Sequence, residues 1–313
     1  MNWLDDYVRP TLKTLGMGGG KEVPDNLWTQ CPSCQKMMFK KQLDEALHVC
    51  QHCGHHLRVP VDIRLASLFD DTGYEVLPTP TVTPDPLKFK AKKAYVQQIK
   101  ENSRRSGTQE AIVVANGEIG GNSALAAVFN GEFIGGSMGR AVGEAFVQAC
   151  QRAVQQNAGF IVFTNSGGAR MQEGALSLMQ MPRTTIGVQM LREAGLPYIV
   201  VMTNPTYGGV TASLAMLGDI HLAEPGAMIG FAGRRVIEDT IREKLPDDFQ
   251  TAESNHKFGL IDQVVSRSEM RDRLISLLGY MMPPKQDGGS HDAATVRSSE
   301  LAPASANELG SKS

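Results

Sequence analysis

Residues 161–174 read IVFTNSGGARMQEG. The apolar, β-branched first part predicts a buried strand, and the last part is typical of the first turn of a helix. Between them lie Thr-Asn-Ser and two glycines. The turn therefore presents backbone amides to a ligand and little else that would act in catalysis.

The same order of elements recurs along the middle of the chain. An apolar strand, a glycine turn and a helix follow one another at residues 126–146, 160–179, 198–217 and, more weakly, 227–245. Strands that alternate with helices predict an α/β architecture with parallel pairing. Recurrence at roughly 25–40 residues predicts a coil of stacked repeats.

The helix predicted after the first of these strands has an apolar stripe with a spacing of four residues. Its pairs are Ala141/Val142, Ala145/Phe146, Ala149/Cys150 and Ala153/Val154. We expect this stripe to face the core. Cys150 is expected to be a buried thiol, because free cysteine is among the most buried residue types.

Composition divides the chain into five segments. They are a loosely structured lead-in (1–26), a cysteine- and histidine-rich block (27–57), a helical and proline-rich connector (58–108), the repeat domain (109–282) and a polar tail (283–313). The tail is aperiodic and rich in small residues, which predicts disorder.

Composition, net charge and the length of the apolar runs argue against several classes of protein. The chain has 313 residues, of which 42% are hydrophobic and 20% charged, and its formal net charge of −2 is no global signature of nucleic-acid binding. The first residues contain acids and no long apolar core, unlike a secretory signal. The strongest apolar run, residues 198–202, is too short to span a bilayer. We expect a protein of the cytoplasm or of an organelle interior.

Four of the five cysteines form a metal motif. Cys31, Cys34, Cys50 and Cys53 have the spacing C-x2-C-x15-C-x2-C, in which two tight knuckles aim four thiolates at one point. The motif predicts one structural Zn²⁺ per chain, in a reducing compartment. Four histidines crowd this block, and we expect them to face solvent or to support the thiolates, with direct ligation of the metal as the alternative: His48, His52, His55 and His56.

A four-cysteine ribbon is also a common nucleic-acid module. Basic residues that would contact phosphates are Lys36, Lys40, Lys41, Arg58 and the stretch at 88–105. The alternative for these residues is a solvated face or a subunit contact.

Glycines are placed where the helices of the repeats are predicted to start. The first amides of a helix have no partner within it and lie at the positive end of its dipole, so they suit a phosphate or a developing oxyanion. The candidate donors are Gly167, Gly168 and Ala169 in one turn and Gly208 and Gly209 in another. The alternative role of any single glycine is that of a turn or packing residue.

Arginines are also placed at predicted helix starts, where the dipole disfavours a cation. Such a placement indicates either an anionic ligand or an ion pair with a nearby glutamate. The four arginines are Arg140, Arg170, Arg234 and Arg235, and the nearby glutamates are Glu144, Glu173 and Glu238.

A competing motif lies in the first glycine turn. Residues 135–139 read GGSMG and match the G-x-S-x-G nucleophile elbow, with Ser137 as the nucleophile of a serine hydrolase. Such an enzyme needs an acid and a histidine later in the chain. Asp219 and His256 come in that order, but His256 lies in no recognisable motif.

Together, the ribbon and the glycine turns resemble the carboxyltransferase β-subunit family of bacterial and plastid acetyl-CoA carboxylases. The resemblance covers about residues 27–282. It rests on CPSC, CQHCGHHLR, FIGGSMGRAVGE, SGGARMQEG, LSLMQM, GLPYIVVMTNPTYGGVTASLAMLGD, AEPGAMIGFAGRRVIE and REKLP. The lead-in and the tail are not diagnostic.

The resemblance implies a crotonase-like fold of repeated β-β-α turns behind an N-terminal zinc ribbon. It implies a transferase that moves a carboxyl group from carboxybiotin to acetyl-CoA, giving malonyl-CoA in the first committed step of fatty acid synthesis. The implied partners are an α subunit of related fold, in an assembly of two α and two β subunits, and a biotin carboxyl carrier protein with its biotin carboxylase. The implied compartment is the bacterial cytoplasm or the plastid stroma.

In the mechanism that this resemblance implies, the cofactor supplies the base, so the protein stabilises the thioester enolate and the ureido oxygen with fixed amides. By similarity to crotonase-type enzymes, the donors are the amides of residues 167–169 and 208–209, with one turn serving acetyl-CoA and the other biotin, in either order. The arginines named above would hold the phosphates of CoA, with Arg234 or Arg235 as the first candidates.

Overall fold

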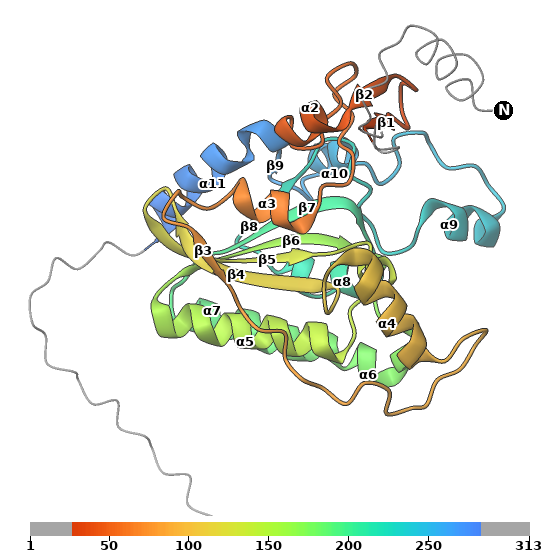
Figure 1. Ribbon diagram of the computed structural model, residues 1–313, viewed down its shortest axis with the longest axis horizontal. Helices are drawn as coiled ribbons and strands as arrows, with labels where there is room; N and C mark the ends of the chain where they lie inside the picture. Colours follow the sequence, from red (N-terminus) through yellow and green to blue (C-terminus); the bar gives the residue numbers. More distant parts are fainter. Residues whose placement is uncertain (1–26, 283–313) are drawn as a thin grey trace, which may run out of the picture. The chain divides into compact units, whose positions relative to one another are not determined.

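The computed structural model describes residues 27–282, so the predicted lead-in and the predicted disordered tail lie outside the described residues. The ribbon block contains a two-stranded antiparallel sheet and a short helix (Figure 1). These elements are β1 (Trp28–Gln30), β2 (Met37–Phe39) and α2 (Lys40–Glu45). No helix within the described part of the chain is long and apolar enough to cross a membrane.

The rest of the described chain is built around a seven-stranded sheet whose strands follow one another in chain order. The strands are β3 (Tyr74–Val76), β4 (Ile112–Ile119), β5 (Asn122–Phe129), β6 (Gly159–Ser166), β7 (Tyr198–Thr206), β8 (Ile220–Ala223) and β9 (Gln263–Val264). Pairing is parallel from β5 to β9, as predicted. It is antiparallel between β3, β4 and β5, because β3 and β4 precede the predicted strand–turn–helix repeats. Only Gly120 and Gly121, both with positive φ, join β4 to β5, and a two-residue turn makes a hairpin rather than a crossover.

Helices cover both faces of this sheet. The helices α5 (Arg140–Gln156) and α7 (Gln180–Glu193) lie on one face, and α3 (Val61–Ala66) and α11 (Arg267–Met281) lie on the other (Figure 1). Alternate residues of β6 therefore enter two different cores: Phe160 and Val162 on the α5 side, Ile161 and Phe163 on the α11 side. Because both faces of the strand are buried, its sequence is apolar without alternation.

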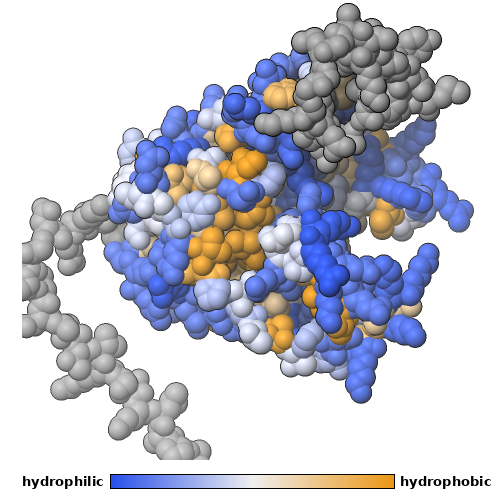
Figure 2. Space-filling model, viewed as in Figure 1, coloured by the Kyte–Doolittle hydropathy of each residue, from blue (hydrophilic) through white to orange (hydrophobic). Residues whose placement is uncertain are grey.

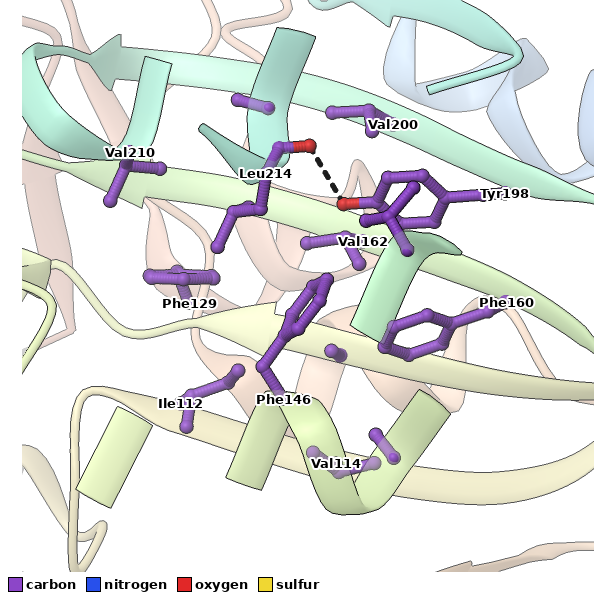
Figure 3. Close-up of a cluster of buried hydrophobic side chains, with 14 of the residues drawn as sticks. Ile112, Val114, Phe129, Phe146, Phe160, Val162, Tyr198, Val200, Val210 and Leu214 are labelled. Atoms are coloured by element: carbon purple, nitrogen blue, oxygen red, sulfur yellow. Dashed lines mark hydrogen bonds between the residues drawn. The ribbon is translucent and has the colours of Figure 1, made fainter. Parts of the chain in front are cut away.

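The core on the α5 side is rich in aromatic residues (Figure 3). Phe146 contacts Phe160 and Tyr198, with ring centroids 5.4 and 6.0 Å apart. The Tyr198 hydroxyl donates a hydrogen bond of 2.8 Å to the Leu214 carbonyl. The predicted stripe of α5 is buried except for its last residue, Val154, and the prediction of a buried Cys150 is confirmed.

Three of the four predicted repeats form a strand, a turn and a helical segment. The turns and helices after β5, β6 and β7 are η2 (Ile134–Gly136), η3 (Met171–Glu173), α6 (Ala175–Leu178), α8 (Gly208–Thr211) and η4 (Leu214–Met216), together with α5 and α7. In the fourth repeat the helix α9 (Arg234–Ile241) forms, but the predicted strand does not. Met228 and Ile229 make only isolated bridges, because the apolar run between Gly226 and Gly230 is only three residues long.

Two further helices complete the described chain. They are α4 (Tyr95–Ser106), within the basic stretch of the connector, and α10 (Ala252–Lys257), before β9. The helix α4 ends at Gly107, which adopts the left-handed conformation that commonly terminates a helix. It reaches the turn after β5, because the Arg105 guanidinium donates to the Glu132 carbonyl at 2.7 Å.

Candidate active site

The turns after β6 and β7 lie against each other. These strands are parallel neighbours, so their carboxyl ends, where α/β sheets bind ligands, meet at one edge. A Cβ atom on Gly168 would lie 3.1 Å from the Gly208 Cα, and one on Gly208 would lie 3.3 Å from the Gly167 carbonyl oxygen. Gly168 also has a φ of +110°. Glycine is therefore required here for close approach of the two backbones.

Two of the five predicted donors are open to a ligand. Within residues 27–282, the Ala169 and Gly209 amides donate to no acceptor, and a Cβ atom on Gly209 would lie 3.5 Å from the Ala169 nitrogen. The other three amides hold the turns in shape: Gly167 donates to Gly135 O at 3.0 Å, Gly168 to Ser166 Oγ at 3.0 Å and Gly208 to Phe231 O at 2.9 Å.

Side chains of the two strand ends hold the turns together. Thr203 Oγ1 donates to the Thr164 carbonyl at 2.7 Å, and the Thr164 and Thr206 hydroxyls share a bond of 2.8 Å. Asn165 Nδ2 donates to the Asn204 carbonyl at 3.0 Å. The Thr-Asn pair that both turns share in sequence is therefore a structural clamp behind the amides.

Of the four arginines, Arg170 is the most buried. Its side chain is fully buried and bonds to both carboxylate oxygens of Glu110, at 2.9 and 2.5 Å. Burial alone would lower the pKa of Arg170, but the facing Glu110 carboxylate raises the pKa above its usual value. Its guanidinium is enclosed by protein, so it does not present a charge to CoA.

The other three arginines differ in what their guanidinium groups contact. Arg140 donates to the Thr83 carbonyl at 2.8 Å, and Arg234 clamps a loop through carbonyls that include Leu245, at 3.0 Å. Arg235 is 94% exposed, with Asp239 3.7 Å away, and presents its guanidinium to solvent. The predicted ion pair with a nearby glutamate forms at two arginines. Arg170 lies 3.6 Å from Glu173, and Arg234 lies 3.7 Å from Glu238. Glu144 pairs with Arg183 and not with Arg140.

The residues of the hydrolase alternative are engaged elsewhere. Ser137 is buried, its hydroxyl donates to the Ile134 carbonyl at 2.8 Å, and it accepts from Arg170 Nε at 3.2 Å. Asp219 accepts from the Tyr198 amide, at the start of β7, about 25 Å along that strand from the glycine turns. His256, near the end of α10, bonds to the Ile261 carbonyl at 2.9 Å. These contacts do not form a triad.

The four cysteines of the ribbon converge. The Sγ atoms of Cys31 and Cys53 are 3.7 Å apart, those of Cys34 and Cys50 are 3.8 Å apart, and all four lie within 4.8 Å of one another. A tetrahedron with Zn–S bonds of about 2.3 Å has an edge of about 3.8 Å, so the sulfur positions fit zinc. Two of the histidines bond to other groups: His48 Nε2 to Asp44 at 2.8 Å, and His56 through Nδ1 to the Gly54 carbonyl at 3.1 Å and through Nε2 to the Arg267 amide at 3.2 Å.

A buried charge cluster attaches the ribbon to the sheet. Glu224, at the end of β8, pairs with Arg64 at 2.6 Å and with Arg267 at 2.5 Å, and all three side chains are almost fully buried. Arg267 also donates to the carbonyls of Leu47 and Leu57, at 2.7 and 3.0 Å. The ribbon is therefore held directly to the domain that carries the glycine turns.

A cavity of about 780 Å³ lies where the ribbon meets the sheet. Its apolar wall comes from α3, β3 and β4, and Figure 2 shows apolar side chains gathered over these elements. Arg58 and Asn165 supply polar groups to its lining, and Asn165 is the second-last residue of β6, just before the glycine turn. The cavity therefore adjoins the same edge of the sheet as the open amides.

Comparison with known proteins identifies the family. Residues 82–308 match a carboxyl transferase domain, and residues 28–53 match an acetyl-CoA carboxylase zinc finger domain. Over 285 residues the chain is 55% identical to the acetyl-coenzyme A carboxylase carboxyl transferase subunit beta of Gluconobacter oxydans, covering 91% of this chain and 98% of that protein. The chain belongs to this β-subunit family.

Other relatives carry the same family name, and solved structures share the fold. Subunits beta from Gluconacetobacter diazotrophicus and Sinorhizobium medicae are 54% and 49% identical, over 95% and 97% of this chain and 99% and 98% of theirs. The fold matches a Pseudomonas malonate decarboxylase heterodimer, with a TM-score of 0.56, 22% identity and coverage of 72% of this chain and 88% of that one. It also matches transcarboxylase 12S, with a TM-score of 0.57, 23% identity and coverage of 71% and 41%. The predicted crotonase-like fold with an N-terminal four-cysteine ribbon is confirmed.

Several residues around the β-subunit site were not predicted from the sequence. Tyr95 and Glu110 surround Arg170, and Arg64, Glu224 and Arg267 attach the ribbon. None of these five residues belongs to a sequence motif that indicates a binding or catalytic role. A charged residue inside an otherwise apolar segment, such as Glu224 directly after β8, was the one available signal.

Proposed function

We propose that this carboxyltransferase β subunit holds the thioester oxygen of acetyl-CoA on the amides of Ala169 and Gly209. The observation that carries the proposal is that these amides alone, among the predicted donors, are open where the two glycine turns meet. Carboxybiotin, when bound, supplies the carboxyl group and the base. The chain's part is to donate two hydrogen bonds to the oxygen as negative charge develops on it.

The geometry favours one shared donor site over two separate ones. Because the turns lie in contact, the Ala169 and Gly209 backbones are close enough for one amide from each turn to donate to a single oxygen. We therefore assign both turns to acetyl-CoA, and assign the donors for the ureido oxygen of biotin to the α subunit. The Thr-Asn clamp behind the turns keeps the two amides in place without a change of conformation during the reaction.

Exposed apolar side chains next to the turns support a partner at this edge. Met171, Met179 and Phe231 are 68%, 55% and 71% exposed, and the Phe231 carbonyl accepts from the Gly208 amide. A site that stabilises an enolate must exclude water. We propose that the α subunit covers this edge, and that a biotin carboxyl carrier protein delivers carboxybiotin to the interface in a bacterial cytoplasm.

The proposal is tested by reconstitution. The purified chain, mixed with the α subunit from the same genome, biotin and malonyl-CoA, is expected to form acetyl-CoA in the reverse reaction. Each subunit alone is expected to be inactive. Full activity of this chain by itself would contradict the shared site, and an inactive complex of the correct stoichiometry would contradict the function.

Arg235 is proposed to contact the phosphates of CoA. Arg235→Ala is expected to raise the KM for malonyl-CoA about fivefold to tenfold with kcat unchanged, because one charge contact worth about 1 kcal/mol is lost. The matched control is Arg192→Ala, which removes an exposed arginine from α7. Equal KM values for the two variants would remove Arg235 from the site.

The ribbon is proposed to hold one structural zinc per chain. Cys50→Ser is expected to reduce zinc content, measured by mass spectrometry of metals, from one per chain to near zero and to lower the melting temperature, because metal binding contributes folding free energy. Cys150→Ser is the control, since this buried thiol lies outside the motif and is expected to leave the zinc in place. Stoichiometric zinc in Cys50→Ser would count against the assignment.

A further inference from the structure

We infer that Arg170, Glu110 and Tyr95 form a buried platform that positions the Ala169 amide for catalysis. The inference rests on the proposed function, in which that amide is a donor. Arg170 directly follows Ala169 in the chain, and its side chain is fully buried in the protein. Its role is to position a donor and not to touch the substrate.

Two backbone hydrogen bonds enclose Ala169. The Met138 amide donates to the Gly168 carbonyl at 2.8 Å, and the Arg170 amide donates to the Met138 carbonyl at 3.0 Å. Ala169 is thus the residue between two fixed peptide groups, and its own amide has no internal acceptor among the described residues. The direction of that amide therefore depends on how firmly residues 168 and 170 are held.

The Arg170 side chain fastens the same segment to three other elements. Its guanidinium donates to the Ser137 carbonyl at 2.7 Å, to Glu110 Oε1 at 2.5 Å and to the Tyr95 hydroxyl at 3.1 Å. The carbon at its centre lies 5.4 Å from the Phe133 ring centroid. The turn after β6 is therefore tied to the turn after β5, to the start of β4 and to α4.

The charges of this cluster are balanced within the protein. The Tyr95 hydroxyl donates to Glu173 Oε1 at 2.6 Å, and Glu173 Oε2 accepts from the Arg140 amide at 2.8 Å, at the first turn of α5. Arg170 neutralises the charge of Glu110, and the positive end of the α5 dipole offsets the charge of Glu173. Such a network is fully bonded and resists rearrangement, which suits a fixed catalytic amide.

A buried tyrosine elsewhere in the chain provides a matched control. Tyr95 and Tyr198 are both 1% exposed, and each hydroxyl donates one strong hydrogen bond to a buried acceptor. Tyr198 lies at the opposite end of β7 from the glycine turns and bonds to the Leu214 carbonyl (Figure 3). Tyr→Phe at either position removes one buried hydroxyl and leaves the ring.

The test compares these variants in the complex with the α subunit. Tyr95→Phe is expected to lower kcat about fivefold to tenfold with the KM for malonyl-CoA unchanged, and Arg170→Lys, which keeps the charge but loses the fork of donors, is expected to lower kcat further. Tyr198→Phe is expected to lower the melting temperature by a similar amount and leave kcat unchanged. Hydrogen exchange of the segment 167–171 is expected to quicken in Tyr95→Phe and not in Tyr198→Phe.

Two results separate this inference from the function on which it rests. If Gly168→Ala abolishes turnover while Tyr95→Phe keeps kcat within twofold of the original protein, the platform is purely structural and the inference is overturned. If Gly168→Ala also keeps full activity, the amide site itself is wrong. If Arg170→Lys does not fold, Tyr95→Phe and the exchange measurement still decide, because they retain the Arg170–Glu110 pair.

Discussion

Replacing Gly168 with alanine is expected to lower kcat in the reverse assay by about 100- to 1,000-fold. Loss of one oxyanion donor typically costs about 2.7–4 kcal/mol of transition-state stabilisation. A Cβ atom at this position would lie 3.1 Å from the Gly208 Cα and 3.2 Å from the Gly209 nitrogen, and neither backbone atom can rotate away. The two turns would have to shift apart by a few tenths of an ångström, and the positive φ of Gly168 would strain the alanine, so we expect the Ala169 and Gly209 amides to lose their alignment toward one oxygen.

The matched control for this substitution is Gly195→Ala. Gly195 also has a positive φ, of +66°, but a Cβ atom there would meet no atom within 4 Å. It therefore introduces the same kind of backbone strain, of order 1–2 kcal/mol, without a collision. We expect reduced stability and an unchanged kcat for Gly195→Ala. If both variants lost activity in proportion to their melting temperatures, the case for the converging amides would fail.

Replacing Glu224 with alanine is expected to lower the free energy of unfolding by about 3–5 kcal/mol. This carboxylate lies between Arg64 and Arg267, and its removal leaves two buried guanidinium groups without their anion. Arg267 also binds the ribbon through the Leu47 and Leu57 carbonyls, so we expect the ribbon to loosen as well. Urea denaturation of the purified full-length chain measures the change.

The control for Glu224 is an ion pair at the surface. Lys93 and Glu101 are more than half exposed and pair at 2.6 Å, so Glu101→Ala is expected to change the unfolding free energy little. A loss at Glu224 no larger than that at Glu101 would show that the buried cluster is not a main attachment of the ribbon.

Acid sensitivity gives a second measurement of the Glu224 cluster. Burial alone would raise the pKa of Glu224, but the two arginines outweigh it and lower the pKa to about 2. Because the folded pKa lies below the unfolded value of about 4.3, the stabilisation is present above that value and is lost as the pH falls toward 2. We expect Glu224→Gln to lose less stability than the original protein over this pH range, since its amide does not titrate.

The chain's local patterns were sufficient for the metal motif and for much of the fold. Cysteine spacing places two knuckles without knowledge of the rest of the chain, and the four sulfur atoms do converge. Apolar runs such as residues 160–163 predicted buried strands, and the structure confirms them. The strand predicted in the fourth repeat does not form. An apolar run next to glycines has no local feature that shows whether it will pair with a neighbouring strand.

By itself, the sequence determined which turns carry glycine, and hence which backbone amides are candidates to bind a ligand. Only the tertiary structure decided which of those amides remain free, because Gly135 O, Ser166 Oγ and Phe231 O take up three of them through contacts that no local pattern contains. It also decided that Arg170 faces inward: its partner Glu110 is sixty residues away in the chain. An arginine at a helix start carries the same local signal whether its counter-ion is a ligand or a distant carboxylate, and only packing brings one of them within reach.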